Sequence, residues 1–238
     1  MKIFIFIFLL LSLPLPTSAV TLIGSGVGAG CSTPQDGSEL NEGFLGAGAE
    51  NTWTEVEGSG ATLDLDFTLS GDPEYGSCSE GMNVDIPISN GNETLVKYTF
   101  AADITYPIEL YFVIYLDSIT LGNYEAFDIV MSIDNAETGI GFRLVLFNDS
   151  GTTSILVANG DDSSYSTPQT FSLDTKHIVK VRLDATRADS YLQLDDGSEY
   201  TFTRDNAAFR KFLVGVPWHI ETDEAVDIEF GRVEVDKP

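Results

Sequence analysis

A strand-turn-strand pattern near the C-terminal end constrains the fold of this chain more than any other feature. Residues 176–185 alternate between two faces. One face would carry Ile178, Lys180, Arg182 and Asp184, and the other Val179, Val181, Leu183 and Ala185. A period of two residues is typical of a half-buried β-strand and not of a helix. Asp196-Gly197 then supplies a tight turn into residues 199–203, so the sequence predicts an antiparallel hairpin.

Similar patterns recur along most of the chain, separated by turns rich in Gly, Asn, Asp and Ser. We expect strands near residues 61–69, 94–101, 108–119, 127–134, 141–147, 153–158, 169–173, 177–185, 190–194, 199–203, 211–220 and 226–235. Many short strands without a long helical period predict an all-β fold, in which two antiparallel sheets pack as a sandwich. Residues 108–116 are almost all apolar, which predicts a central strand covered on both faces.

The first 19 residues have the organisation of a secretory signal peptide. Lys2 precedes residues 3–13, which are apolar apart from Ser12, and the small side chains of residues 17–19 offer a cleavage site. This stretch is too short to span a bilayer, so we expect a secreted or cell-surface protein with no membrane insertion after cleavage. Residues 20–48 would form a Gly-rich N-terminal arm, and residues 49–238 the sandwich domain.

The chain is strongly acidic, with a net charge of −25 from 12 basic and 37 acidic residues. Such a surface repels phosphate backbones, which argues against a nucleic-acid partner. It is compatible with cationic partners and with divalent cations. It is also typical of a protein that stays soluble in salty water. We favour this interpretation over one in which the acidic side chains bind a specific partner.

Two cysteines and two glycosylation sequons fit an exported protein. Cys31 and Cys78 allow one intramolecular disulfide. In the chain-entropy description, closing such a loop stabilises the fold by about 4 kcal/mol. Asn92 and Asn148 begin sequons in turn-like segments, which would be used only in a host that glycosylates proteins.

A series of motifs, taken in order, resembles the laminin G-like domains of the concanavalin A-like lectin and glucanase superfamily. The series comprises Glu42-Gly43-Phe44, Trp53-Thr54-Glu55, Asp64-Leu65-Asp66, residues 96–100 and 108–112, Phe212-Leu213-Val214-Gly215 and residues 230–236. The resemblance covers roughly residues 43–236. It implies a jelly-roll sandwich with a concave and a convex sheet, which binds glycans or proteins, often beside a calcium ion at the loop rim.

Glycan binding of this kind needs aromatic side chains that stack on sugar rings. The candidates are Tyr111, Tyr115, Tyr124, Tyr165 and Trp218. Calcium prefers carboxylate and carbonyl oxygens on flexible loops. The candidate ligands are Asp161, Asp162, Asp195 and Asp196. Rim packing of the aromatic residues and solvation of the aspartates are the competing interpretations.

Our first interpretation is a secreted, non-catalytic module that binds a carbohydrate or an extracellular surface protein. A second is a structural or adhesive surface protein that self-assembles through residues 20–48. The third is a glycoside hydrolase, because glucanases of this superfamily carry Glu-x-Asp-x-Glu on one face of a strand. The nearest match, residues 224–229, places only Asp227 and Glu229 on one face, and these two are the catalytic candidates.

Overall fold

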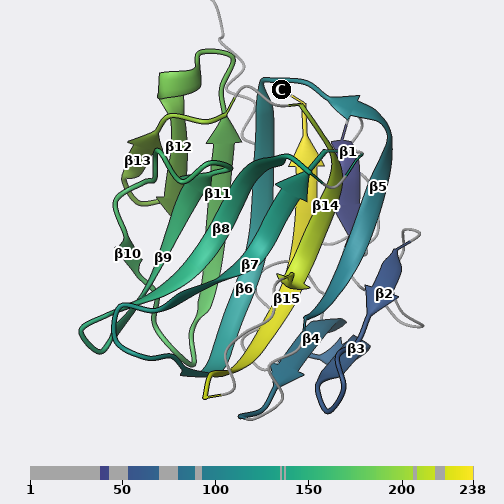
Figure 1. Ribbon diagram of the computed structural model, residues 1–238, viewed down its shortest axis with the longest axis vertical. Helices are drawn as coiled ribbons and strands as arrows, with labels where there is room; N and C mark the ends of the chain where they lie inside the picture. Colours follow the sequence, from purple (N-terminus) through teal and green to yellow (C-terminus); the bar gives the residue numbers. More distant parts are fainter. Residues whose placement is uncertain are drawn as a thin grey trace, which may run out of the picture.

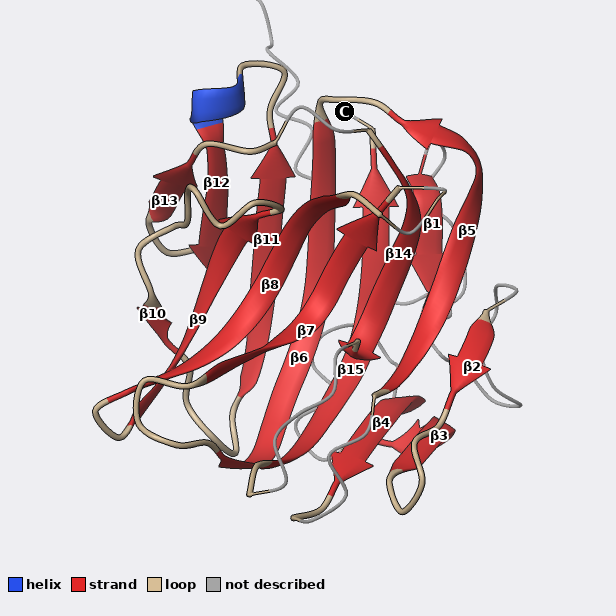
Figure 2. Cartoon of the chain, in the orientation of Figure 1, coloured by secondary structure: helices blue, strands red, loops and turns tan. Residues whose placement is uncertain are grey.

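The computed structural model describes residues 38–42, 53–69, 80–88, 93–134, 136, 138–205, 208–217 and 223–237. They form two antiparallel sheets that lie face to face (Figure 1). Strands dominate in Figure 2, and the only helical element within these ranges is one 3-10 turn, η1 (Arg187–Asp189). The predicted fold class, an all-β jelly-roll sandwich of two antiparallel sheets, is confirmed.

The eight-stranded sheet is built around two long strands, β6 and β15. Its order is β13 (Glu199–Phe202), β12 (Ser190–Leu194), β11 (Lys176–Leu183), β6 (Ile108–Thr120), β15 (Ala225–Asp236), β4 (Glu80–Ile86) and β3 (Thr62–Thr68). The eighth strand, β1 (Ser38–Glu42), pairs with the last residues of β15. The edge of β15 that faces away from β6 is therefore shared between β4 and β1.

The seven-stranded sheet lies in front of it in Figure 1. Its order is β10 (Gln169–Thr170), β9 (Thr152–Asn159), β8 (Ile140–Asp149), β7 (Ala126–Ile133), β14 (Phe209–Val216), β5 (Thr94–Ile104) and β2 (Thr54–Val56). Its strand pairs are all antiparallel.

The core lies between the two sheets and is rich in phenylalanine. Phe112 of β6 stacks on Phe212 of β14, with ring centroids 6.0 Å apart and planes at 13°. Both side chains are fully buried, as are Phe142 and Phe209 next to them. Burial of one such side chain stabilises the fold by about 1.5–3 kcal/mol. The alternation of buried residues therefore fixes which side chains each strand turns to the outer face.

Two expectations are wrong in part. β6 is central, as predicted, but it is not covered on both faces, because Glu109, Tyr111 and Tyr115 lie half-buried on its outer side. β1 lies within residues 20–48, which the sequence assigns to an arm, and its pairing with β15 of the same chain starts the sandwich before residue 49. β1 is difficult to recognise because it is short and lies in a Gly- and Ser-rich region.

Several predicted features lie outside the described residues. They are the signal peptide, Cys31, Cys78, Asn92 and Trp218. In the part of the chain that the structure describes, no helix has the length and apolar character needed to cross a membrane.

Candidate functional site

The outer face of the eight-stranded sheet carries rows of polar and aromatic side chains. Because the apolar residues of β6 point into the core, Tyr111 and Tyr115 point outward. Strand register then decides which side chains lie next to them. Tyr111 lies opposite Lys180 of β11 on one side and Glu234 of β15 on the other. The row continues to Gln193 of β12, which lies opposite Lys180.

The next row crosses the same four strands, and most of its side chains are charged. Glu109 of β6 lies between Asp236 of β15 and Arg182 of β11, and Arg182 lies opposite Tyr191 of β12. The two rows therefore bring two tyrosines, Tyr111 and Tyr191, to the same face of the sheet.

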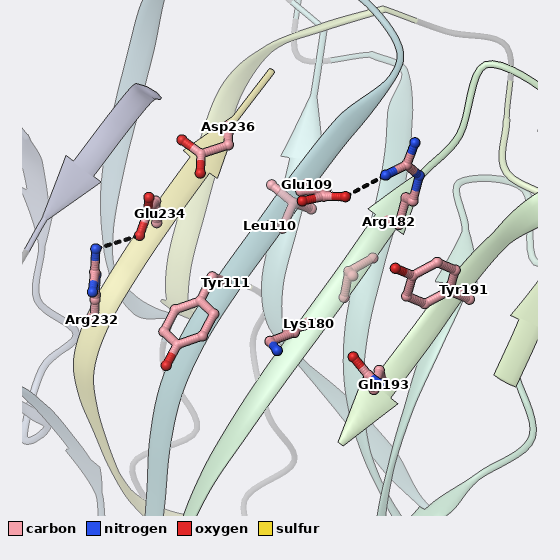
Figure 3. A pocket seen from close by; sticks show the side chains of 11 residues that line it. Glu109, Leu110, Tyr111, Lys180, Arg182, Tyr191, Gln193, Arg232, Glu234 and Asp236 are labelled. Carbon is pink, nitrogen blue, oxygen red and sulfur yellow. Dashed lines mark hydrogen bonds and ion pairs between the residues drawn. The ribbon is translucent and has the colours of Figure 1, made fainter. Parts of the chain in front are cut away.

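These rows surround an open hollow of about 400 Å³ (Figure 3). It is lined by Glu109, Leu110 and Tyr111 of β6, Lys180, Val181 and Arg182 of β11, Tyr191 and Gln193 of β12, and Arg232, Glu234 and Asp236 of β15. Figure 3 shows Tyr111 and Tyr191 on either side of Lys180. Because every lining residue belongs to a regular strand, backbone pairing holds their spacing fixed.

Ion pairs hold Arg182 in place at one end of the hollow. Its Nη1 donates to Glu109 Oε1, and its Nε donates to Asp184 Oδ2 at 2.9 Å. Asp184 and Glu109 together raise the pKa of the Arg182 guanidinium above its usual value. Arg182 therefore stays charged and oriented.

Arg232 and Glu234 form the opposite wall. Arg232 Nη2 lies 2.6 Å from Glu234 Oε2, and the guanidinium carbon is 5.6 Å from the centre of the Tyr111 ring. Burial, with a further contribution from Asp236, raises the pKa of Glu234 from its usual 4.5 to about 7. Arg232 Nε is buried and has no hydrogen-bond partner among the residues that the structure describes. A carboxyl with a perturbed pKa beside an unsatisfied donor, in a hollow, marks a candidate binding site.

A second hollow, of about 620 Å³, lies on the outer face of the seven-stranded sheet. Most of its lining is apolar. Arg143 pairs with both Asp128 and Asp162, so these three charged side chains of the second hollow form one ion-pair network. Tyr165 lines this hollow and is 64 % exposed. We regard the first hollow as the better candidate, because polar groups surround it and two tyrosines line it.

The predicted aromatic residues do not form one site. Tyr111 lines the first hollow, and Tyr115 points out of the same face four residues further along β6. Tyr124 is 65 % exposed in the loop after β6, at the end of that strand remote from Tyr111. Tyr165 belongs to the second hollow, and Trp218 lies outside the described residues.

The four aspartates that we expected to bind calcium are divided between two turns. Asp161 and Asp162 follow β9, and Asp195 and Asp196 follow β12. Each carboxylate has a partner in the protein: Ser163 N–H for Asp161, Arg143 for Asp162, His177 for Asp195 and Lys180 for Asp196. Among the described residues, no three Asp, Glu, His or Cys side chains are grouped so that they could hold a metal ion. Calcium binding stays a prediction.

The catalytic candidates share the outer face of β15, as the alternation predicts. Asn83 Nδ2 donates to Asp227 Oδ1 at 2.7 Å, and burial raises the pKa of Asp227. Glu229 is buried. Glu224, the residue nearest to the missing first acid, lines the hollow on the opposite sheet. The three carboxylates of the glucanase pattern therefore do not meet on one face.

The lining residues from β11 and β15 are absent from the predicted site. Alternation does place Lys180 and Arg182 on a polar face, and the same period would place Arg232 and Glu234 on one side of β15. The sequence does not show that β6 lies between β11 and β15, because these strands are far apart along the chain. Without the order of the strands in the sheet, the sequence indicates only an ordinary solvated face for these charged residues.

Comparison with known proteins supports the fold and not a particular family. No protein-family model matches the sequence, and no curated protein sequence matches it. Among solved structures, the chain is similar to the cellulose-induced protein Cip1, with a TM-score of 0.58 and 15 % identity over 84 % of this chain and 97 % of that one.

Binding domains of botulinum neurotoxins are also similar. The binding domain of serotype C, whose cell entry depends on interaction with two ganglioside molecules, gives a TM-score of 0.56 and 10 % identity over 84 % of this chain and 48 % of that one. The serotype D domain in complex with N-acetylneuraminic acid gives 0.51 and 11 % over 84 % and 47 %. The chain thus spans about half the length of these neurotoxin domains. At such low identity, the likeness establishes a shared sandwich fold.

Proposed function

We propose that this protein is a secreted, non-catalytic carbohydrate-binding module of the laminin G-like type, and that it binds a glycan in the hollow on the eight-stranded sheet. The observation that carries the proposal is the pair of tyrosines, Tyr111 and Tyr191, on either side of Lys180 in an open hollow. An aromatic face stacks on the apolar face of a sugar ring, and fixed polar groups bind its hydroxyls.

The polar groups of the hollow offer both kinds of hydrogen bond that sugar hydroxyls need. Lys180 and Arg232 provide donors, while Glu234 and Asp236 provide acceptors, and Gln193 provides both. Of the described lining, three side chains are cationic and three are acidic, so the hollow has no excess charge of either sign. This balance favours a neutral glycan over a strongly anionic or cationic one.

The similar proteins support a glycan as the class of ligand, but their acidic sugars do not support a neutral one in particular. The neurotoxin domains are described with a sialic acid and with gangliosides, which are glycans or carry them. Secretion follows from the N-terminal signal pattern, and a glycan on a cell surface or in an extracellular polymer is the partner that we propose.

The test is a glycan-array screen of the purified protein, followed by titration of the best neutral hit with single variants. We expect Tyr111→Ala to weaken binding by about tenfold, because one stacking contact is lost. Lys180→Ala should weaken it as well, and this half-buried side chain lies on the outer face and can be removed without disturbing the core.

Two further variants make the assignment specific. Lys97→Ala, on β5 of the opposite sheet, is the matched control and should bind as the unmodified protein does. Tyr165→Ala probes the second hollow. Loss of binding in Tyr165→Ala with full binding in Tyr111→Ala would move the site to the seven-stranded sheet. An array with no hit would contradict the proposed function.

A further inference from the structure

The outer face of the eight-stranded sheet repeats one arrangement of side chains. In the row described above, Lys180 of β11, Tyr111 of β6 and Glu234 of β15 lie side by side. Four residues further along β6, Tyr115 lies between Lys176 of β11 and Glu229 of β15. We call these the upper and lower triplets. Each places Lys, Tyr and Glu on three neighbouring strands in the same order.

A bulge in β15 makes the repeat possible. The step between the triplets is four residues on β6 and on β11, but five on β15. Register shifts between Phe230 and Arg232, so Gly231 is the additional residue. Without this bulge, Val233 would lie opposite Tyr111, and the two glutamates could not both face outward. The bulge thus keeps an acidic residue beside each tyrosine.

The exposure of the two triplets is also alike. Tyr111, Tyr115, Lys176 and Lys180 are all half-buried, so part of each side chain reaches the surface. Glu229 and Glu234 are both buried next to the tyrosines with which they pair. A phenol ring, an ammonium donor and a carboxylate acceptor together supply what one sugar unit requires.

The surface between the triplets is apolar. Val113 and Ile178 lie opposite each other there and are only 6 % and 7 % exposed, so neighbouring atoms pack closely around both side chains. On the β15 side, a Cβ atom at Gly231 would lie 3.0 Å from Leu69 Cδ1, which shows that Leu69 packs over that part of the strand. A ligand that joins the triplets would therefore pass over β6 and β11.

We propose that the two triplets are successive subsites for one linear glycan chain that runs along β6, an inference that rests on the proposed function. Four residues of a strand span about 13 Å. A single sugar ring is much shorter than this distance, so it can contact only one tyrosine. A chain of several sugars can contact both, and the preferred ligand is then an internal stretch of a linear polysaccharide rather than one terminal sugar.

The experiment measures how affinity depends on chain length. The probes are cello-, xylo-, manno-, laminari- and chito-oligosaccharides, each as a disaccharide and as a hexasaccharide, titrated into the purified protein by calorimetry. We expect a hexasaccharide to bind about tenfold more tightly than the disaccharide of the same series, because the second subsite adds contacts. Tyr115→Ala should lower the hexasaccharide affinity to that of the disaccharide and leave the disaccharide within about twofold.

The variants separate the possible outcomes. Tyr111→Ala should weaken both chain lengths, and Lys176→Ala, which removes a strand-end side chain, gives a second test of the lower triplet that does not depend on the folding of Tyr115→Ala. Equal affinity for both lengths, or unchanged hexasaccharide binding in both lower-triplet variants, would overturn the inference and leave the proposed function standing. Failure of every oligosaccharide to bind would overturn both.

Discussion

Tyr111 on β6 lies directly opposite Glu234 on β15, at the centre of the eight-stranded sheet and on its outer face. The side chain of Glu234 is 7 % exposed and its carboxyl group pairs with Arg232, whose guanidinium in turn lies near the Tyr111 ring. One cross-strand pair thus joins an aromatic surface to a buried acid. The stability of the protein and the chemistry of the hollow both depend on this acid.

Glu234→Gln should change how stability depends on pH. Burial raises the pKa of Glu234 to about 7, so between pH 4.5 and 7 the folded protein holds a proton that the unfolded chain has released. The stabilisation is complete below pH 4.5 and is lost as the pH rises to about 7. We expect this loss to be about 3 kcal/mol, measured by urea unfolding across that range, and absent in Glu234→Gln.

The control for that experiment is Glu199→Gln, which alters an exposed carboxyl on β13. Its stability should follow the unmodified protein at each pH. Parallel curves for Glu234→Gln and the unmodified protein would contradict the role given to Glu234.

The strands with clear alternation could be predicted from the sequence, and the reason is local. β11 and β12 have apolar and polar side chains at a period of two over residues 179–183 and 191–193, and burial follows this pattern in the structure. β4 has the same signal, with Met82, Val84 and Ile86 buried, but it lies outside the predicted strands. The residues before and after β4 in the sequence are rich in Gly, Ser and Asp, which is typical of loops. A short alternating segment between them is therefore difficult to recognise as a strand.

The candidate site could be predicted only in part, because its geometry depends on contacts between distant segments. Alternation brings Tyr111 and Tyr115 to one face of β6. It cannot show that β11 and β15 flank that strand, or that Gly231 forms a bulge that sets Glu234 beside Tyr111. Strand order and bulges are decided by packing over the whole sandwich, and a single sequence carries no direct trace of them.

Arg204→Ala should destabilise the protein strongly. The Arg204 guanidinium is buried, donates to the carbonyl oxygens of Asp184, Ala185 and Asp205, and lies 3.5 Å from the centre of the Tyr106 ring. The alanine variant would leave three carbonyl groups without their donor. We expect a loss of about 3 kcal/mol in urea unfolding.

Arg204→Lys tests whether geometry or charge matters at this site. A lysine keeps the positive charge but lacks the planar guanidinium, so its single ammonium group cannot donate to all three carbonyl groups. We expect an intermediate loss. Stability equal to that of the unmodified protein would show that the carbonyl contacts contribute little.

Gly215→Ala should disturb the pairing of β14 with β5. Gly215 has a φ of +123°, and a Cβ atom there would lie 2.6 Å from the Thr94 carbonyl oxygen and 2.8 Å from Leu95 Cα. Both contacts are with backbone atoms, so the strands would have to move apart. We expect a loss of about 3 kcal/mol, measured as a fall in the free energy of unfolding.

Gly151→Ala is the matched control. Gly151 also has a positive φ, of +90°, but no atom lies within 4 Å of the Cβ position. Only the backbone strain remains, and the expected loss is about 1 kcal/mol. Equal losses in the two variants would mean that strain, and not the close approach of β5, limits position 215.

Calcium binding at the four predicted aspartates can be tested by removing their carboxylates. An ion at Asp162 would have to displace Arg143, and an ion at Asp196 would have to displace Lys180. If calcium binds in these turns, it should raise Tm, and Asp161→Asn/Asp162→Asn or Asp195→Asn/Asp196→Asn should remove that rise. An unchanged Tm with calcium and with EDTA would contradict the predicted ion.

The sequon at Asn148 should remain unmodified even in a host that glycosylates proteins. Asn148 Nδ2, the atom to which a glycan would be attached, donates to the carbonyl oxygens of Leu121 and Gly122 at 2.7 and 3.1 Å. Its Oδ1 accepts a hydrogen bond from Gly151 N–H at 2.9 Å. A glycan at Nδ2 would remove one of these donors and press a bulky group against the loop after β6. We expect peptide mass spectrometry of the protein produced in such a host to find Asn148 unmodified, and Asn148→Ala to cost about 2 kcal/mol of stability. Full occupancy together with an unchanged Tm would show that the loop opens at little cost.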